Sequence, residues 1–131
     1  MSGKKVLLDS NIIIYLSKGL LNFDEILNDY DQHSISIITY MEVLGYNFTN
    51  SNEEKLIREF MQLFDIIHLD MGIANLVISL KKKKKIKLPD AIILASAKAN
   101  NHDLMTFNLD DFENIESDVN VFKPPIKDIH N

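Results

Sequence analysis

Short apolar runs alternate along this chain with longer stretches in which apolar residues recur at every third or fourth position. Three consecutive apolar residues, Val6, Leu7 and Leu8, form the first run. Unbroken runs of this length are typical of parallel strands that are covered on both faces. This run predicts a strand at residues 4–8. Shorter apolar segments predict strands at residues 33–38, 65–69 and 103–106, and a further short strand at residues 119–122.

Segments with helical spacing of apolar residues separate these strands. They predict helices at residues 12–16, 23–30, 40–46, 53–64, 72–84 and 90–100. The segment 12–16 is rich in β-branched residues and is compatible with a strand as well, but the capping triplet Asp9-Ser10-Asn11 before it favours a helix. Because strands alternate with helices, we expect a three-layer α/β/α fold with a central, mostly parallel sheet of four or five strands.

Thr39 and Glu42 are spaced as in a capping box, in which a hydroxyl and a carboxylate satisfy free N–H groups at the start of a helix. We therefore expect Thr39 to cap the helix at 40–46 and Glu42 to lie in its first turn. Pro89, which precedes Asp90, is likewise compatible with the first turn of a helix.

Composition narrows the class of protein. The 131 residues are 46% hydrophobic, which fits one globular domain spanning residues 1–131. The formal net charge of −5 argues against a protein that coats nucleic acid through bulk positive charge, but it does not exclude an enzyme that acts on RNA, because the local field at the site decides that. The absence of cysteine excludes disulfide scaffolds, cysteine–zinc sites and thiol catalysis.

The N-terminal apolar run is interrupted by Asp9 and is too short for a secretory signal. No apolar stretch approaches the roughly 18 residues of a membrane span. We therefore expect a soluble, cytoplasmic protein with no membrane partner.

Four acidic residues lie in or near segments that follow predicted strands or begin a predicted helix. Asp9 directly follows the first strand, Glu42 lies in the helix after the second, Asp90 begins a helix, and Asp111 follows the fourth strand. The carboxyl ends of parallel strands open on one edge, where ligands bind. This places three of the carboxylates together by topology, whereas spacing alone does not place Asp90. Clustered carboxylates are costly unless a cation compensates them, and a divalent ion would make them a hydrolytic site.

Each of these residues also has a purely structural explanation. The alternatives are a helix cap for Asp9, half of a capping box for Glu42, an ordinary helix start for Asp90 and a solvated turn for Asp110 and Asp111. Their joint occurrence beside apolar segments favours the functional interpretation.

Four segments resemble the signature of PIN-domain ribonucleases, above all of the VapC-like toxins of type II toxin–antitoxin pairs. They carry Asp-Ser-Asn at 9–11, Thr-x-x-Glu at 39–42, Leu-Pro-Asp-Ala at 88–91 and Thr-x-Asn-x-x-Asp at 106–111, in the family's order. The Leu-Pro-Asp-Ala block is the most specific of the four. The resemblance covers roughly residues 4–122.

The resemblance implies a metal-dependent endoribonuclease in which Asp9, Glu42, Asp90 and Asp111 form an acidic pocket for Mg²⁺ or Mn²⁺. Asp9 and Asp90 are expected to touch the ion most directly. The resemblance also implies an RNA substrate, a small antitoxin protein as partner, and a homodimer. Candidates for an interface are the apolar residues of the first helices, Ile12, Ile13, Leu20 and Leu21, although a core position is favoured for Ile13.

Two departures from the family pattern affect the expected site. Phe107 stands where an Arg or Asn is frequent, which puts a local cation in doubt, and Asp110 leaves the fourth acidic position open between itself and Asp111. Polar neighbours of the four carboxylates are candidates to orient them or to contact phosphate, or else act as caps and turn formers. These neighbours are Ser10, Asn11, Thr39, Thr106 and Asn108.

Lys81 to Lys85, with Lys87, make the one dense positive segment of the sequence. It is either a solvated helix end, favoured by the helix dipole, or a patch that contacts phosphate beside Asp90 and offsets the repulsion between RNA and the acidic pocket. Two other functions compete with the toxin hypothesis: a non-catalytic PIN-like module that binds RNA or protein, and a PIN nuclease of RNA processing.

Overall fold

The computed structural model describes residues 4–112, 115–116 and 118–124. Its strands form one sheet in the order β3-β2-β1-β4-β5, and every pairing in it is parallel. The strands are β1 (Lys5–Leu8), β2 (Gln32–Ser36), β3 (Asp65–Ile67), β4 (Asp103–Met105) and β5 (Val121–Phe122). The predicted sheet is therefore confirmed, and it is parallel throughout.

The helices alternate with the strands along the chain. They are α1 (Ser10–Ser17), α2 (Phe23–Leu27), α3 (Ile37–Leu44), α4 (Ser51–Met61), α5 (Met71–Lys83), α6 (Leu88–Ala99) and α7 (Leu109–Phe112). The first six correspond to predicted helices, with ends that differ by a few residues. The segment 12–16, which was compatible with a strand, is helical because Asp9 caps α1. The short α7 contains Asp110 and Asp111, for which a solvated turn was the purely structural explanation.

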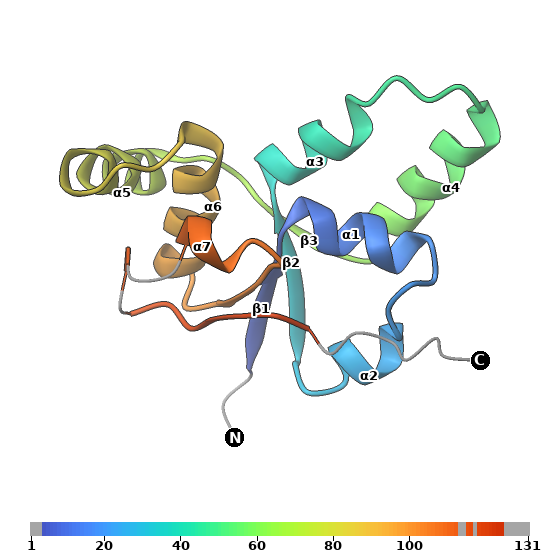
Figure 1. The fold of residues 1–131 in the computed structure, drawn as a ribbon, viewed down its shortest axis with the longest axis horizontal. Coiled ribbons are helices and arrows are strands. Elements are labelled where there is room, and N and C mark those ends of the chain that lie inside the picture. Colours follow the sequence, from blue (N-terminus) through green and yellow to red (C-terminus); the bar gives the residue numbers. More distant parts are fainter. Residues whose placement is uncertain (1–3, 113–114, 117, 125–131) are drawn as a thin grey trace.

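Alternating side chains of the central strand β1 fill two cores on opposite faces of the sheet. Leu7 packs in the core that α5, α6 and α7 cover, whereas Val6 and Leu8 pack in the core that α1, α2 and parts of α3 and α4 cover. Figure 1 shows the two helical layers on either side of the sheet. All seven residues from Ala91 to Ala97 are buried, which explains why α6 is so rich in Ala and Ile. The predicted three-layer arrangement is confirmed.

Helix α3 begins earlier than predicted. Strand β2 passes directly into it, and the Oγ atom of Ser36 caps it by accepting a hydrogen bond from the N–H of Ile38 at 3.1 Å. Thr39 is consequently buried within the first turn, and Glu42 lies in the second turn. The predicted capping box is wrong because Ser36 is the capping residue, a role that the β-branched residues after it concealed in the sequence.

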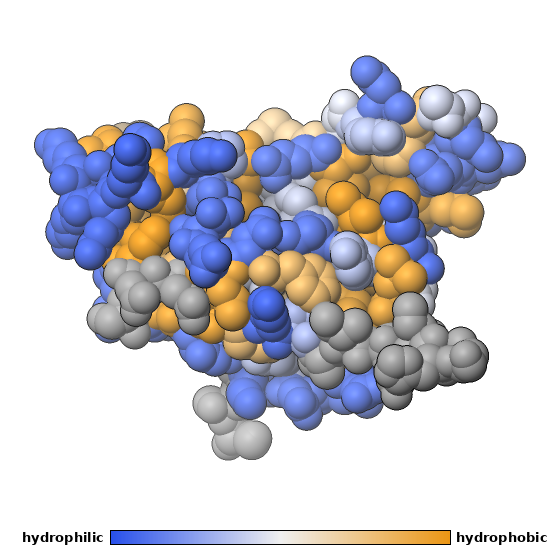
Figure 2. Space-filling view, in the orientation of Figure 1, coloured by the Kyte–Doolittle hydropathy of each residue, from blue (hydrophilic) through white to orange (hydrophobic). Residues whose placement is uncertain are grey.

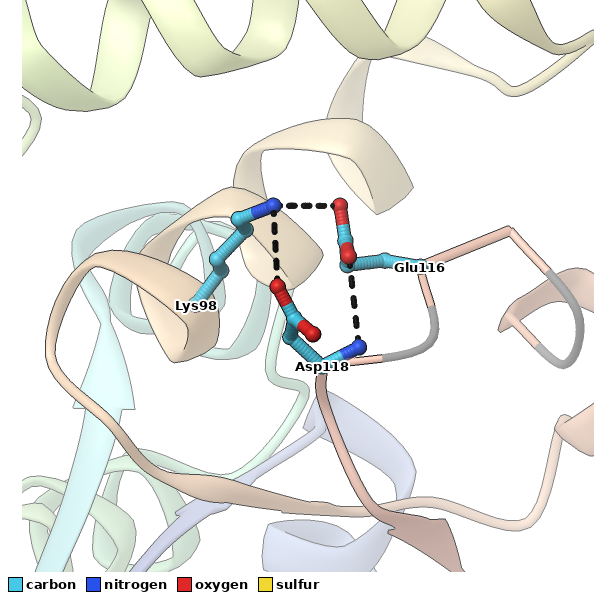
Figure 3. A network of polar contacts seen from close by, with 3 residues as sticks. All are labelled: Lys98, Glu116 and Asp118. Carbon is cyan, nitrogen blue, oxygen red and sulfur yellow. Dashed lines mark hydrogen bonds and ion pairs between the residues drawn. The ribbon is translucent and has the colours of Figure 1, made fainter.

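Glu116 and Asp118, which precede β5, are fastened to the C-terminal end of α6 by Lys98. The Nζ atom of Lys98 lies 2.7 Å from Oε2 of Glu116 and 3.6 Å from Oδ2 of Asp118. The backbone N–H of Asp118 also donates to Oε1 of Glu116 at 3.2 Å, so one cation and two carboxylates close a small network (Figure 3). This network ties Glu116 and Asp118 to α6.

The apolar residues considered for an interface belong mostly to the core. Ile12 and Ile13 are completely buried and Leu21 is 3% exposed, whereas Leu20 is 40% exposed. The core position favoured for Ile13 is confirmed. The prediction that Ile12 or Leu21 contributes to an interface is wrong, because both side chains are buried. Among the described residues, none of the helices has the length and apolar character needed to cross a membrane.

Candidate functional site

Asp9 lies at the edge of the sheet where the carboxyl ends of β1 and β4 meet. Its backbone N–H donates to the carbonyl of Met105, the last residue of β4, at 3.0 Å. The residue is the N-cap of α1, and only 6% of its surface is exposed. A carboxylate therefore sits almost buried between the two central strands.

Two hydrogen bonds fix the carboxylate of Asp9. Its Oδ1 accepts from the backbone N–H of Ser10 at 2.8 Å, and its Oδ2 accepts from the hydroxyl of Thr106 at 2.7 Å. The Oγ1 atom of Thr106 in turn accepts from the N–H of Asn108 at 3.0 Å, which leaves the hydroxyl proton for Asp9. The carboxylate of Asp9 is thus both the helix cap and the buried acidic group, and each of its two oxygens accepts a hydrogen bond.

Glu42 reaches the same region from α3. It is exposed, and its Oε1 accepts a hydrogen bond from the hydroxyl of Ser10 at 2.7 Å. The same hydroxyl lies 3.5 Å from Oγ1 of the buried Thr39. Ser10 therefore links the start of α1 to α3 and orients Glu42.

Asp90 is the third residue of α6, after Leu88 and Pro89. It is partly buried, and burial is the main reason why its pKa is raised; the negative charges of Asp111 and Asp9 raise it further, while Lys87 lowers it. The charge of Glu42 also raises the pKa of Asp90. The structure thus brings Asp90 into the group that sequence spacing alone could not complete.

The burial of Asp9 raises its pKa, and the hydrogen bonds from Thr106 and Ser10 lower it. The charges of Glu42 and Asp111 raise it again. The other three predicted carboxylates therefore act on Asp90, and two of them act on Asp9. Burial, which is the largest cause, and these charges together raise the pKa of both aspartates, which hold a proton more readily than a free aspartate does. An arrangement of this kind favours a cation.

Asp111 and Asp110 are both exposed on α7, but they differ in their electrostatic influence. Asp111 raises the pKa of both Asp9 and Asp90, whereas Asp110 is not among the main influences on either. A hollow of about 320 Å³ opens beside them. Its lining consists of Phe107, Asn108, Leu109, Asp110, Asp111 and Lys123.

Lys123 is a residue of the site region that the sequence did not single out. It directly follows β5, which pairs with β4 in register, so its backbone leaves the sheet at the same edge as Asp9. The sequence signal was a lysine after the last predicted strand, but that strand is only two residues long. Lys123 supplies a cation beside Asp111 in a region where Phe107 does not.

The donor atoms at this edge suit a hard divalent ion. They are carboxylate oxygens, without histidine or cysteine, and Mg²⁺ and Mn²⁺ prefer such oxygen ligands. Within the described residues no three acidic or histidine side chains converge closely enough to bind one ion by themselves. Mg²⁺ keeps several waters and takes only one or two carboxylates directly, so the separated arrangement still fits it. The buried Oδ1 of Asn11, next to Ser10, also lacks a hydrogen-bond partner among the described residues.

Comparisons with known proteins show the family of this chain. A family model described as PIN domain matches residues 6–117. A chain in a toxin–antitoxin complex from Klebsiella pneumoniae is 36% identical, with 87% of this chain and 94% of that chain covered and a TM-score of 0.75. No curated protein matches the sequence.

Two further solved structures extend the comparison. A chain of VapBC-1 from nontypeable Haemophilus influenzae is 28% identical, with 91% of this chain and 97% of that chain covered and a TM-score of 0.67. DNA-bound VapBC from Salmonella typhimurium shares the fold at 21% identity and a TM-score of 0.79, with 92% of this chain and 98% of that chain covered. Because the family model spans most of the sequence, the chain belongs to the PIN domain family and resembles its VapC-like members.

Proposed function

We propose that the protein is a metal-dependent endoribonuclease and the toxin component of a toxin–antitoxin pair. The observation that carries the proposal is the gathering of carboxylates at the edge where the central strands end. Asp9 is almost buried there, Ser10 holds Glu42 beside it, and the charges of Asp111 and Asp9 act on Asp90. A fold needs no such group for its stability, because like charges held together cost free energy. Membership in the PIN domain family and the likeness to the Klebsiella complex support a toxin nuclease.

In this proposal Asp9 and Asp90 would hold a Mg²⁺ or Mn²⁺ ion directly, and Glu42 and Asp111 would orient its water molecules. A bound divalent ion lowers the pKa of water and offsets negative charge on a phosphodiester. Thr106 and Ser10 keep Asp9 and Glu42 in place through the hydrogen bonds described above. Asn108 and Lys123, which line the hollow beside Asp111, are placed to receive a phosphate group.

We further propose that an antitoxin binds the apolar groove between α1, α3 and α4. Its volume is about 940 Å³, and exposed apolar side chains such as Tyr46 and Leu56 line it. Figure 2 shows apolar surface gathered over this part of the molecule. Because Glu42 also lines the groove, a peptide seated there would reach the proposed active site. A homodimer is part of the same proposal, and light scattering of the purified chain tests it.

Cleavage of RNA by matched variants tests the proposed roles. We expect Asp9→Asn, Asp90→Asn and Asp111→Asn to abolish cleavage in the presence of Mg²⁺ or Mn²⁺, because each removes a negative charge that binds or orients the ion. Asp110→Asn is the matched control: it removes the adjacent exposed carboxylate and is expected to keep most of the activity. Circular dichroism verifies that each variant is folded.

The outcomes separate the alternatives. Equal loss of activity in Asp110→Asn and Asp111→Asn would contradict the assignment of the fourth carboxylate. A wild-type protein that neither cleaves RNA nor binds Mn²⁺ in a calorimetric titration would contradict the nuclease proposal. That result would favour a non-catalytic module that binds RNA or protein.

A further inference from the structure

Six lysines lie at the C-terminal end of α5 and in the connection from α5 to α6. Positions 81–87 hold six of the 14 Lys and Arg residues in a chain whose net charge is −5. All six lysines are exposed, and Ile86 between them is buried. The positive charge of the protein is thus concentrated in one short segment, which we call the lysine segment (residues 81–87).

The shape of the lysine segment is fixed by the chain itself. Helix α5 ends at Lys83, and Lys84 adopts an extended conformation as its C-cap. The Nζ atom of Lys81 turns back and donates to the carbonyl of Ile86 at 2.9 Å, while the side chain of Ile86 anchors the turn in the core. The connection is therefore held in place, and its other lysines project from a defined turn.

None of the six lysines forms an ion pair among the residues that the structure describes, although the charge of Lys83 acts on Glu116 and that of Lys87 on Asp90. Among the described residues, the ion pairs join Arg58 to Glu54 and Lys98 to Glu116 and Asp118, and none involves the lysine segment. The favourable interaction of cations with a helix C-terminus is limited to the last turn and is worth about 0.3–1 kcal/mol. It accounts for Lys82 and Lys83 at most, and Lys85 and Lys87 lie beyond the helix.

The C-terminal end of the lysine segment lies close to the proposed active site. Lys87 is the N-cap of α6, three positions before Asp90, and its charge acts on the Asp90 carboxyl group. The other lysines of the segment lie toward α5 in the chain. The end of the molecule that holds α5 has a largely hydrophilic surface in Figure 2. A polyanion that approaches the carboxylates would meet positive charge on one side of them.

We propose that the lysine segment binds the phosphate backbone of the RNA substrate and holds it beside the carboxylates. This inference rests on the proposed ribonuclease function and adds where the RNA strand enters the site. RNA phosphates repel the acidic edge, and the lysines offset this repulsion locally, although the protein as a whole is acidic. The lysines bind phosphates, so they contribute affinity without selecting a base sequence.

Salt-dependent binding measures this interaction directly. The probe is fluorescein-labelled oligouridine, followed by fluorescence anisotropy in excess chelator so that no cleavage occurs. For single strands the slope of log K against log salt falls in magnitude by about 0.7 for each phosphate that the protein no longer neutralises. We expect the double variant Lys82→Gln/Lys84→Gln to lower the slope by about 1.4 and to weaken binding at low salt by roughly tenfold or more.

The matched control removes the same charge from the other end of the molecule. Lys55→Gln/Arg58→Gln changes two exposed cations of α4, which lies far from α5 in Figure 1. Arg58 holds only an exposed pair with Glu54, so the fold tolerates the change. The control is expected to keep the slope of the wild type. Thermal unfolding verifies that both double variants are folded.

Other outcomes overturn the proposal. Equal slopes for the two double variants would show that the lysine segment does not bind RNA. A weakening confined to duplex DNA, with oligouridine binding unchanged, would assign the segment to DNA instead. A weakening of binding to a co-expressed acidic protein, with oligouridine binding unchanged, would assign it to a protein partner. RNA binding that depends on the lysine segment in a protein that cleaves no RNA would leave this inference intact while the proposed nuclease function fails.

Discussion

The structural role of Asp9 is compatible with the metal-binding role proposed for it. Asp9 caps α1 through Oδ1, while its Oδ2 accepts a hydrogen bond from the hydroxyl of Thr106. The sequence predicted Thr106 as a neighbour, but not which oxygen it would meet, because that hydrogen bond joins residues that are 97 positions apart. Such long-range hydrogen bonds depend on the register of β1 and β4.

Thr106→Val tests how far this hydrogen bond supports the site. The hydroxyl lowers the pKa of Asp9, so its removal raises that pKa further above the ordinary value. Asp9 then takes up a proton at higher pH, and the acid limb of the pH–rate profile is expected to shift to higher pH. Cleavage at neutral pH should fall by about 10- to 100-fold, as for residues that orient metal ligands.

The control for Thr106→Val is Thr49→Val, which changes an exposed threonine outside the helices. It is expected to leave both the rate and the pH profile unchanged. An unshifted acid limb in Thr106→Val would show that the hydroxyl does not act through Asp9.

At the scale of elements, alternation of apolar runs and helical spacing predicted the order of strands and helices, because each core face needs that pattern. The predicted boundary between β2 and α3 was wrong, since Ile37 and Ile38 are β-branched residues that fit the end of a strand as well as the start of a helix. The start of the helix is marked by the hydrogen bond from the N–H of Ile38 to the Oγ atom of Ser36, which the sequence pattern did not indicate. Asp90 was placed through the Leu-Pro-Asp-Ala resemblance, since its approach to Asp9 and Asp111 depends on how α6 packs.

His102 joins elements that are two strands apart in the sheet. Its Nε2 atom lies 3.0 Å from the hydroxyl of Ser34 on β2, and its Nδ1 lies 2.9 Å from the carbonyl of Asn100 after α6. Only the neutral ring with a proton on Nδ1 lets Ser34 donate to Nε2. Burial lowers the pKa of His102 below its ordinary value of 6.5, with a smaller lowering contribution from Lys5, while the Asn100 carbonyl and the charges of Asp103 and Asp65 raise it.

This lowered pKa predicts an acid-sensitive fold. The unfolded chain takes up a proton on His102 near pH 6.5, whereas the folded protein does so only at lower pH. The unfolded state therefore binds more protons in this window, and stability is expected to fall as the pH drops below about 6.5. Chemical denaturation of the wild type and of His102→Gln at several pH values measures the effect, and His68→Gln, at an exposed histidine, is the control. A pH dependence that is identical in all three proteins would contradict it.

At the scale of the whole molecule, a parallel sheet gathers residues from distant segments at one edge. The fold class and the four acidic positions followed from the sequence pattern together with the family resemblance, because strand ends fix where the chain leaves the sheet. The apolar groove between α1, α3 and α4 and the position of Lys123 did not follow from it. Both arise from the packing of elements whose sequences show no signal that they meet.

The most direct test of the central claim is the rate of RNA cleavage by the purified chain as Mg²⁺ or Mn²⁺ is titrated in and then removed by excess chelator. Asp9→Asn, prepared in parallel, detects any contaminating nuclease. We expect cleavage that rises to saturation with the metal, disappears in chelator and is absent from Asp9→Asn at every metal concentration. Cleavage by the wild type that continues undiminished in excess chelator, with none by Asp9→Asn, would contradict the assignment of the four carboxylates to a metal-dependent nuclease site.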